Sequence, residues 1–324
     1  MFYSGAMVAT IGLSTLGIFS VLSIAYVYAL RGKERYQSLS EYIRKGWPIA
    51  TPINCLLYLF TKKRVATPII GVDQFPELKK VQENWETIRD EVIAIKEQGY
   101  FDKVTDQSND SYYDIGFRTF YKYGWSKFYI NWYGETHRSA ARLCPKTVEI
   151  LKDIKCVNGA MFSILPVGSK LTRHLDPVAC SFRYHLGLKT PNDDRCFINV
   201  DGVNYSWRDG EDFIFDETYL HYANNNSEEE RIILMCDIDR PLSPIGSFFN
   251  WIFKGILSLS VVPNTPEDRK GLFNRIFSFV TPTLHKVRTL KSSNLALYKA
   301  IKYAVNFTLF LILVGIVYGI LSLF

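Results

Sequence analysis

Several common catalytic signatures are missing from this chain of 324 residues. It contains no G-x-x-x-x-G-K-[ST], no G-x-S-x-G and no G-x-G-x-x-G motif, which argues against a P-loop nucleotidase, an α/β-hydrolase and a dinucleotide-binding enzyme. Its six cysteines include no C-x-x-C pair, so neither a zinc ribbon nor a thioredoxin-type site is expected. Cysteines scattered in this way indicate reduced, mostly buried thiols in a cytosolic environment.

Strong clusters of like charge are absent as well. The net charge is +6, and the lysines and arginines are spread along the chain, with small groups beside apolar segments. That distribution favours contact with a membrane surface over a nucleic-acid groove, so we expect no nucleic-acid partner. Hydrophobic residues make up 48% of the chain, enough for the core of one large domain or two small ones.

Residues 7–30 carry no charge at all. A helix of this length, at about 1.5 Å per residue, crosses a hydrocarbon layer of roughly 30 Å with some tilt. Arg31, Lys33 and Arg35 follow directly, and the positive-inside tendency then places the next domain in the cytoplasm. A cleaved signal peptide is the alternative, but it normally has positive charge before its apolar stretch, and none is present here.

A second uncharged run covers residues 303–324, after Lys299 and Lys302. Those lysines put its entry side in the cytoplasm too, so both runs predict a cytoplasmic central domain. A buried core helix is the alternative interpretation of each run, and their length argues against it.

Two shorter apolar segments are predicted to lie at the membrane surface. Residues 52–60 precede three basic residues at positions 62–64, and residues 248–262 are rich in aromatics around Trp251. Neither segment is long or continuous enough to span a bilayer, so a helix lying among the lipid headgroups is expected. A re-entrant hairpin is the alternative for residues 248–262.

The middle of the chain predicts one amphipathic helix followed by many short strands. Apolar residues recur at helical spacing over residues 76–98. From about Tyr129, runs rich in Ile, Val, Phe and Tyr alternate with turn residues, and the Asp-Gly pair at positions 201–202 predicts a hairpin. The last predicted strand covers residues 231–237. Strands at this spacing favour an antiparallel sandwich or a small barrel.

Three residues suggest a metal centre. His174 and Asp176 form a His-x-Asp pair, and His221 follows on a later predicted strand. Residues i and i+2 of a strand face the same side, so we expect His174 and Asp176 to point together. Two imidazoles and one carboxylate are the ligands of non-haem Fe(II) oxygenases, and they leave three coordination positions open. A zinc hydrolase, a surface His–Asp pair and a satisfied core histidine are the alternatives.

Arg183 and Arg231 are candidates for binding the distal carboxylate of a 2-oxo acid co-substrate. A guanidinium can hold a carboxylate through two parallel hydrogen bonds. Either arginine alone is equally well explained as an ion-pair partner of nearby acids, and this choice stays open. His137 and His285 show no partner pattern and are interpreted as non-functional.

Beyond these patterns, the chain resembles the aspartyl/asparaginyl β-hydroxylase family, and more closely its bacterial membrane-bound lipid A hydroxylases. The resemblance is densest from about residue 112 to residue 242. It rests on ordered motifs that include Trp132-Tyr133-Gly134, Leu143-Cys144-Pro145, Arg173-His174-Leu175-Asp176-Pro177, Arg183-Tyr184-His185-Leu186-Gly187-Leu188, Tyr205-Ser206-Trp207-Arg208-Asp209-Gly210-Glu211 and Phe215-Asp216-Glu217-Thr218.

The resemblance implies a double-stranded β-helix, or jelly-roll, dioxygenase that uses Fe(II), 2-oxoglutarate and O2. In the family, the positions matching His174 and His221 bind iron. The positions that contact the oxo acid match Ser163, Arg183, His185 and Arg231. Animal members have no carboxylate where this chain has Asp176, so the role of Asp176 as a third ligand is a separate prediction.

Together these observations predict a mainly β catalytic core with flanking helices and a transmembrane helix at each end. The predicted parts are an N-terminal anchor (1–35), an interfacial and amphipathic helical region (36–111), the dioxygenase domain (112–242), membrane-interfacial helices (243–302) and a C-terminal transmembrane helix (303–324). The resemblance implies 2-hydroxylation of a secondary acyl chain of lipid A at the cytoplasmic face of the bacterial inner membrane, among membrane lipids. The alternatives are a peptidyl-aspartyl/asparaginyl β-hydroxylase and a non-catalytic membrane-anchored binding protein.

Overall fold

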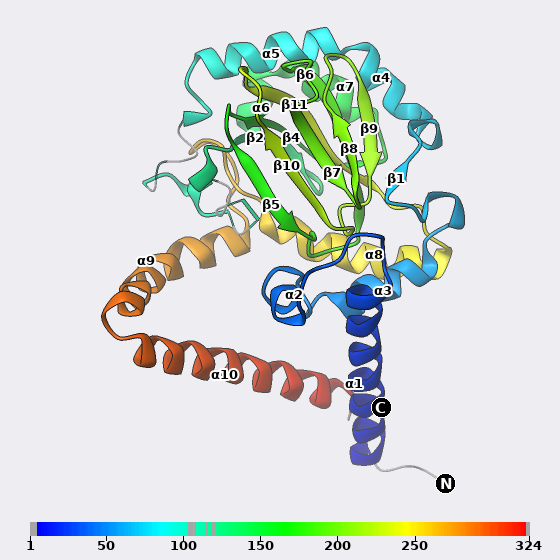
Figure 1. The fold of residues 1–324 in the computed structure, drawn as a ribbon, viewed down its shortest axis with the longest axis vertical. Coiled ribbons are helices and arrows are strands. Elements are labelled where there is room, and N and C mark those ends of the chain that lie inside the picture. Colours follow the sequence, from blue (N-terminus) through cyan, green and yellow to red (C-terminus); the bar gives the residue numbers. More distant parts are fainter. Residues whose placement is uncertain (1–4, 103–105, 107, 115, 118–120, 322–324) are drawn as a thin grey trace. The chain divides into compact units, whose positions relative to one another are not determined.

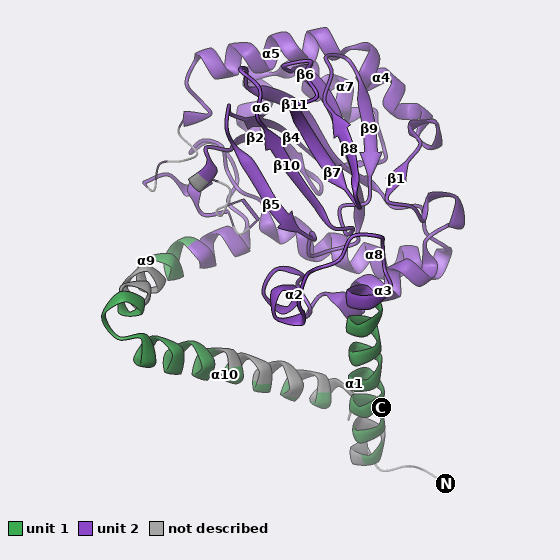
Figure 2. Cartoon of the chain, in the orientation of Figure 1, with its two compact units in different colours: residues 1–26, 278–324 green, residues 27–277 purple. Residues whose placement is uncertain are grey.

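The computed structural model describes residues 5–102, 106, 108–114, 116–117 and 121–321 (Figure 1). The chain divides into two compact units, one of residues 1–26 with 278–324 and one of residues 27–277 (Figure 2).

Two antiparallel sheets form the centre of the unit of residues 27–277. The larger sheet has the order β1 (Ile69–Ile70), β9 (Asp212–Phe215), β6 (Ser181–Lys189), β11 (Arg231–Asp239), β4 (Val157–Leu165), β2 (Ser126–Trp132) and β3 (Glu135–Thr136). The smaller sheet has the order β5 (Lys170–His174), β10 (His221–Asn225), β7 (Cys196–Val200) and β8 (Val203–Ser206). From β4 to β11 the chain passes repeatedly between the two sheets, which is the jelly-roll arrangement, and the predicted antiparallel sandwich is confirmed.

The predicted hairpin is present between β7 and β8. Asp201 has φ 50° and Gly202 has φ 91°, so both central residues lie in the left-handed region. A two-residue turn with this conformation matches the twist of the flanking strands, and Asp-Gly is a preferred sequence for it.

Alternation along the strands separates two cores. On β4 and β11, the side chains of Phe162 and Leu234 pack in a core shared with the helices, whereas those of Met161 and Ile233 pack in a core between the two sheets. Successive strand residues face opposite sides, so Ser163, Arg231 and other residues of the second set point to the space between the sheets. That space is where the candidate site lies.

Helices cover the outer face of the larger sheet (Figure 1). They are α4 (Lys79–Glu83), α5 (Trp85–Glu97), α6 (Arg138–Leu143) and α7 (Pro145–Lys152). The helix predicted over residues 76–98 is interrupted at Asn84, and its apolar side is buried as expected at Leu78, Val81, Ile88, Val92 and Ile95. The short 3-10 helices are η1 (Lys63–Val65), η2 (Val72–Gln74), η3 (Pro76–Leu78), η5 (Asp110–Tyr112), η6 (Tyr121–Tyr123) and η7 (Ser258–Ser260).

Three further helices belong to the same unit: α2 (Leu39–Lys45), α3 (Thr51–Phe60) and α8 (Pro244–Leu257). The rings of Phe60 and Phe249 stack with centroids 6.3 Å apart, which joins α3 to α8. Residues 248–262 form the rest of α8, then η7 and an extended segment, rather than a pair of helices folded as a hairpin. Contact of α3 and α8 with a membrane stays a prediction.

The apolar N-terminal run forms α1 (Gly5–Ala29), and residues Thr10–Ala29 are long and apolar enough to cross a membrane. Among the described residues no other helix meets that criterion. The second apolar run lies in α10 (Leu295–Leu321), which follows α9 (Leu272–Ser293). The last three residues of that apolar run, 322–324, lie outside the described residues, and the C-terminal span stays a prediction.

Candidate metal and oxo-acid site

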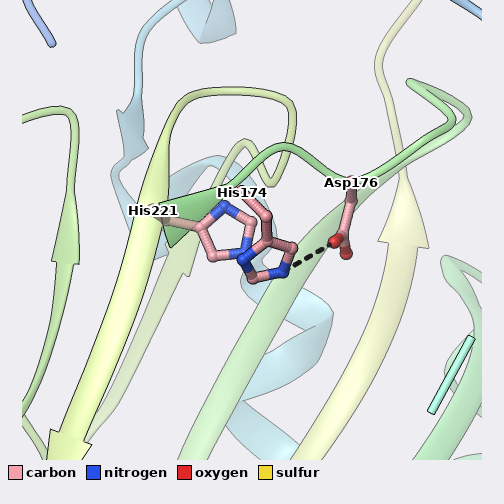
Figure 3. A group of neighbouring side chains, drawn as sticks. All are labelled: His174, Asp176 and His221. Atoms are coloured by element: carbon pink, nitrogen blue, oxygen red, sulfur yellow. Dashed lines mark ion pairs between the residues drawn. The ribbon is translucent and has the colours of Figure 1, made fainter. Parts of the chain in front are cut away.

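His174 and His221 lie opposite each other at the edge of the space between the sheets. His174 is the last residue of β5 and His221 is the first residue of β10, and the two are paired in the register of the smaller sheet. Their ring centroids are 4.2 Å apart with a tilt of 51° (Figure 3). Two histidines that are 47 residues apart in the sequence are therefore brought together by strand pairing, as the sequence predicts.

Hydrogen bonds fix the orientation of both rings. The Nδ1 atom of His174 lies 2.8 Å from the Thr172 carbonyl oxygen, and that of His221 lies 2.9 Å from the Tyr219 carbonyl oxygen. A carbonyl oxygen can only accept, so each Nδ1 carries the proton. Each Nε2 then presents its lone pair, which is the arrangement of metal-binding histidines.

Asp176 completes the cluster, but not for the reason predicted. Strand β5 ends at His174, so Asp176 lies in the following connection and the expected alternation along a shared strand does not apply. Its backbone N–H donates to the Glu217 carbonyl oxygen at 3.0 Å, and its Oδ1 lies 3.2 Å from Nε2 of His174. One ligand atom from each of His174, Asp176 and His221 lies within 4.8 Å of the other two, so these residues can hold one metal ion.

The charge states suit a divalent metal. Burial by itself would raise the pKa of Asp176, but the neighbouring His174, His221 and Arg183 lower it below its usual value. Burial, followed by repulsion from His174, lowers the pKa of His221 to about 4. At neutral pH the carboxylate is ionised and the His221 imidazole is neutral, which are the forms that bind metals.

Arg183 lies beside this cluster and forms ion pairs with three carboxylates. Its guanidinium lies 3.0 Å from Asp176 and 3.1 Å from Asp237, and it forms a further ion pair with Glu217. Burial would lower the pKa of Arg183, but the three carboxylates raise it above its usual value. Of the two explanations left open by the sequence, ion pairing is the one that the structure gives for Arg183.

Arg231 has the opposite environment. It is 1% exposed, and among the described residues it forms no ion pair with a carboxylate. A terminal nitrogen of Arg231 donates a long hydrogen bond to Oγ of Ser163 at 3.4 Å, and its Nε has no partner in the described part of the chain. The guanidinium carbon lies 4.4 Å from the ring centroid of Trp207 and 5.3 Å from that of Trp125. Burial lowers the pKa of Arg231 to about 10.

A buried cation without a counter-ion is unfavourable by several kcal/mol in a protein of ordinary design. Arg231 is nevertheless buried, on the face of β11 that points between the sheets. The arrangement suits an anion supplied from outside the chain, held by the guanidinium and the Ser163 hydroxyl.

His185 also presents an unused hydrogen-bond donor in this space. The indole N–H of Trp207 donates to Nδ1 of His185 at 3.3 Å, so the ring proton is on Nε2. Nε2 is buried and has no partner within the described residues. Burial and the neighbouring Arg231 charge lower the pKa of His185 well below its usual value, so the ring is neutral and its N–H can donate to a bound oxygen.

Aromatic rings connect the two parts of the site. Phe215 lies 5.1 Å from the His185 ring and 5.6 Å from the His221 ring, measured between centroids. The predicted oxo-acid residues Ser163, His185 and Arg231 are therefore buried on the same aromatic side of the larger sheet as the metal cluster, while Arg183 lies on its carboxylate-rich side. A 2-oxo acid fits the donors present: a cation and a hydroxyl for its distal carboxylate, and an adjacent metal for its oxo-acid end.

Sequence reasoning missed three residues that shape the site: Trp207, Glu217 and Asp237. Asp237 shares the face of Arg231 because the two are an even number of residues apart on β11, so strand periodicity had the signal to find it. Glu217 and Trp207 lie inside motifs that carried the family resemblance, but nothing in the sequence gave them a role.

The two remaining histidines lie apart from this cluster. His137 is buried, its Nε2 lies 2.8 Å from the Val262 carbonyl oxygen, and its ring stacks on Tyr129. The side chain of His285 lies outside the described part of the structure.

The segment after α1 is bonded to residues that flank His174 and His221. Arg31 donates to the Thr218 carbonyl oxygen at 2.6 Å, lies 3.0 Å from Asp216, and stacks on the Tyr219 ring at 3.6 Å. Glu34 pairs with Arg173, the neighbour of His174, at 2.8 Å. The chain thus passes from the end of its apolar helix at Ala29 to the rim of the metal cluster within a few residues.

Comparisons with known proteins find similarity to hydroxylases. The sequence profile of the family described as "Aspartyl/Asparaginyl beta-hydroxylase" matches residues 82–241. An "Ornithine lipid ester-linked acyl 2-hydroxylase" of Rhizobium tropici is 32% identical over 151 residues, which cover 46% of this chain and 52% of that protein. The human "Aspartyl/asparaginyl beta-hydroxylase" is 28% identical over 51% of this chain and 21% of its own length. This chain thus spans about half the length of the first relative and less of the second.

Solved structures match smaller parts of the fold. A predicted oxalate decarboxylase of Thermotoga maritima has a TM-score of 0.24 and 13% identity, and the match covers 36% of this chain and 80% of that one. A cupin domain of a transcriptional regulator from Enterobacter cloacae has a TM-score of 0.21 and 13% identity, over 24% of this chain and 77% of that one.

Proposed function

We propose, from the match of residues 82–241 to the aspartyl/asparaginyl β-hydroxylase family, that the protein is an Fe(II)- and 2-oxoglutarate-dependent dioxygenase that hydroxylates C2 of an acyl chain in a membrane lipid. Its proposed substrate is a secondary acyl chain of lipid A, at the cytoplasmic face of the bacterial inner membrane. The reaction converts the C–H bond, O2 and 2-oxoglutarate to the C–OH group, succinate and CO2, so both oxygen atoms and all electrons are accounted for.

The observation that carries the co-substrate assignment is the buried Arg231 with no carboxylate partner in the described structure. The distal carboxylate of 2-oxoglutarate would supply that partner through charge-assisted hydrogen bonds. Ser163 would donate its hydroxyl to the same carboxylate, and the Nε2–H of His185 would donate to another oxygen of the co-substrate.

His174, Asp176 and His221 would hold the ferrous ion, which when bound supplies the activation of O2 together with the oxo acid. The chain's own residues position the metal-binding side chains and exclude water. Carbonyl oxygens hold the two imidazoles in the metal-binding tautomer, and Arg183 holds the carboxylate of Asp176. The rings of Trp207, Phe213 and Phe215 surround His185 and keep this region dry.

A lipid substrate is supported by two observations. The apolar helix Thr10–Ala29 is a candidate membrane span, and the segment that follows it is bonded to residues beside both histidines. The relative in Rhizobium tropici is described as an acyl 2-hydroxylase, which favours the same position of attack on an acyl chain. Ornithine lipid is therefore the second candidate substrate.

The test compares lipids from a bacterial strain that makes lipid A and ornithine lipid without 2-hydroxyl groups. The full chain is expressed beside His174→Ala and beside His285→Ala, a matched histidine control from the other unit. We expect the wild type and the control to add one oxygen at C2 of a lipid A acyl chain and His174→Ala to add none. A gain on ornithine lipid alone would change the substrate, and no gain on any lipid would overturn the proposal.

Peptide hydroxylation remains the competing activity because of the human relative. Succinate release by the purified full chain, measured with acyl lipid and with an Asp/Asn-containing peptide, separates the two. We expect release to be stimulated by the lipid and not by the peptide.

A further inference from the structure

A cavity lies away from the metal cluster, between α8 and the outer face of the larger sheet. Its volume is about 820 Å³, within the range of ligand-binding pockets. One wall comes from α8, with Trp251, Ile252 and Gly255, and the others come from α7 and the ends of β2 and β4. Figure 1 shows α8 running along this end of the sheets. We refer to this cavity as the α8 groove.

The lining of the α8 groove combines an apolar wall with one sign of charge. Ile130, Leu151 and Val157 contribute aliphatic surface, and the three charged lining residues are Lys152, Lys155 and Lys254. Lys254 pairs with Asp239, whereas Lys152 and Lys155 are exposed and form no ion pair among the described residues. Among the residues that the structure describes, no carboxylate lines the groove. This pattern suits a ligand with a hydrocarbon chain and a negatively charged head.

The α8 groove is separate from the space that holds the metal cluster. Leu151 and Ile130 belong to the core between the larger sheet and its helices, whereas Phe215 and Ile233, beside the histidines and Arg231, belong to the core between the two sheets. These lining residues put the groove on the helix-covered side of the larger sheet, on the opposite side from Phe215 and Ile233. Tyr133, beyond the end of β2, also lines the groove, and its hydroxyl donates to Asp237 at 3.2 Å.

The groove is continuous with an exposed apolar face. Trp251 is 71% exposed and Ile252 is 41% exposed, and both also line the groove. Phe248 and Ile245, about one and two turns earlier on α8, are exposed as well. Apolar helical faces of this kind lie at the headgroup boundary of a bilayer, with basic residues directed to anionic lipid.

We propose that the α8 groove binds an anionic phospholipid of the surrounding membrane, as a docking ligand distinct from the substrate. One acyl chain lies against Ile252 and the aliphatic wall, and the phosphate is held by Lys152 and Lys155. This inference rests on the membrane location included in the proposed function, but not on hydroxylation.

The test is native mass spectrometry of the full chain in detergent with equal amounts of phosphatidylglycerol and phosphatidylcholine. We expect phosphatidylglycerol to be retained about tenfold more strongly, since each nearby lysine adds favourable energy to an anionic lipid. Two variants should lower that retention about tenfold: K152E/K155E, which reverses the charge, and G255W, which fills the groove. The position of Gly255 has no heavy atom within 4 Å of an added Cβ, so the backbone accepts a side chain there.

The matched control is K79E/K189E, which changes the net charge equally at two exposed lysines outside the groove. It should retain phosphatidylglycerol like the wild type. Equal retention of the two lipids by the wild type, unchanged retention in both groove variants, or an equal loss in the control would each overturn the proposal. The assay needs neither iron nor oxo acid, so the two proposals can fail separately. If the wild type hydroxylates acyl chains but does not select phosphatidylglycerol, only the proposed lipid site in the α8 groove is contradicted. Intact selectivity without hydroxylation contradicts the proposed function alone.

Discussion

Arg183 and Arg231 lie on neighbouring strands, β6 and β11, and both point to the space between the sheets, yet their surroundings are opposite. Arg183 contacts the carboxylates of Asp176, Glu217 and Asp237. Arg231 contacts none within the described residues and lies among indole rings. The pKa of Arg183 is raised by its carboxylates, whereas that of Arg231 is lowered to about 10 by burial.

The difference separates a structural cation from a binding one. A buried cation with its full set of counter-ions has no capacity left for a ligand, and removing it leaves charges uncompensated. A buried cation without a counter-ion weakens the empty fold and gains most when an anion arrives. We therefore assign the oxo acid to Arg231 and the support of Asp176 to Arg183.

The largest effect on activity should come from removing the metal, on which the roles assigned to Arg231 and Arg183 depend. His174→Ala should lower acyl hydroxylation by more than about 1,000-fold, because metal activation of O2 has no substitute among the side chains. Succinate release per enzyme measures the loss. His174 is the last residue of β5 and lies outside the buried core, so the unfolding free energy should change by less than about 1 kcal/mol. Residual activity near the wild-type level would show that the metal lies elsewhere.

Arg183→Met should destabilise the fold by about 3–5 kcal/mol, because it leaves buried carboxylates without their cation. Urea unfolding of the detergent-solubilised chain checks the value. Adding Glu217→Gln and Asp237→Asn to this variant should recover part of the loss, since the uncompensated acids are then removed. A stability equal to that of the wild type would mean that Arg183 has no such structural role.

Arg231→Met should raise the KM for 2-oxoglutarate about 100-fold, which corresponds to the loss of a charge-assisted pair of about 2–3 kcal/mol. In contrast to Arg183→Met, it should leave the unfolding free energy unchanged or increased, because an unpaired buried charge is removed. Steady-state kinetics and urea unfolding measure the two effects. Arg195→Met, at an exposed arginine, is the control. An unchanged KM would contradict the contrast between Arg183 and Arg231, on which the co-substrate assignment rests.

A third arrangement, with two arginines sharing one carboxylate, gives a smaller and pH-dependent effect. Burial would raise the pKa of Asp216, but Arg240 and Arg31 lower it to about 2. A carboxyl with a depressed pKa stabilises the fold above its unfolded value near 3.8, and the contribution disappears as the pH falls towards 2. The difference in unfolding free energy between the wild type and Asp216→Asn should therefore shrink by about 2 kcal/mol from pH 5 to pH 2. A constant difference would contradict this pairing.

Local patterns predicted much of this fold. The Asp201-Gly202 turn was recognisable because few residue pairs adopt two consecutive positive φ angles, and Arg231 was singled out as a candidate carboxylate binder by its residue type and by the family resemblance. The two histidines were found because their chemistry is rare and their family motif is dense. These features depend on neighbours along the chain or on residue type alone.

Features set by strand register were beyond prediction. Asp176 reaches His174 from a connection after the strand, held there by Glu217 and Arg183, so the argument from alternation gave the right neighbour for the wrong reason. The choice between Arg183 and Arg231 depended on which carboxylates face each guanidinium. Glu217 lies 34 residues from Arg183 in the sequence and becomes its partner only when β6 and β9 pair.

Anaerobic binding of Fe(II) and 2-oxoglutarate to the purified full chain tests the central assignment most directly. Equilibrium dialysis should give one ferrous ion per chain for the wild type and for Arg231→Met, and none for the double variant His174→Ala/His221→Ala. The iron-loaded wild type should bind 2-oxoglutarate, and iron-loaded Arg231→Met should bind it about 100-fold more weakly. Equal oxo-acid binding by these two proteins, or unchanged iron binding by the double variant, would contradict the account.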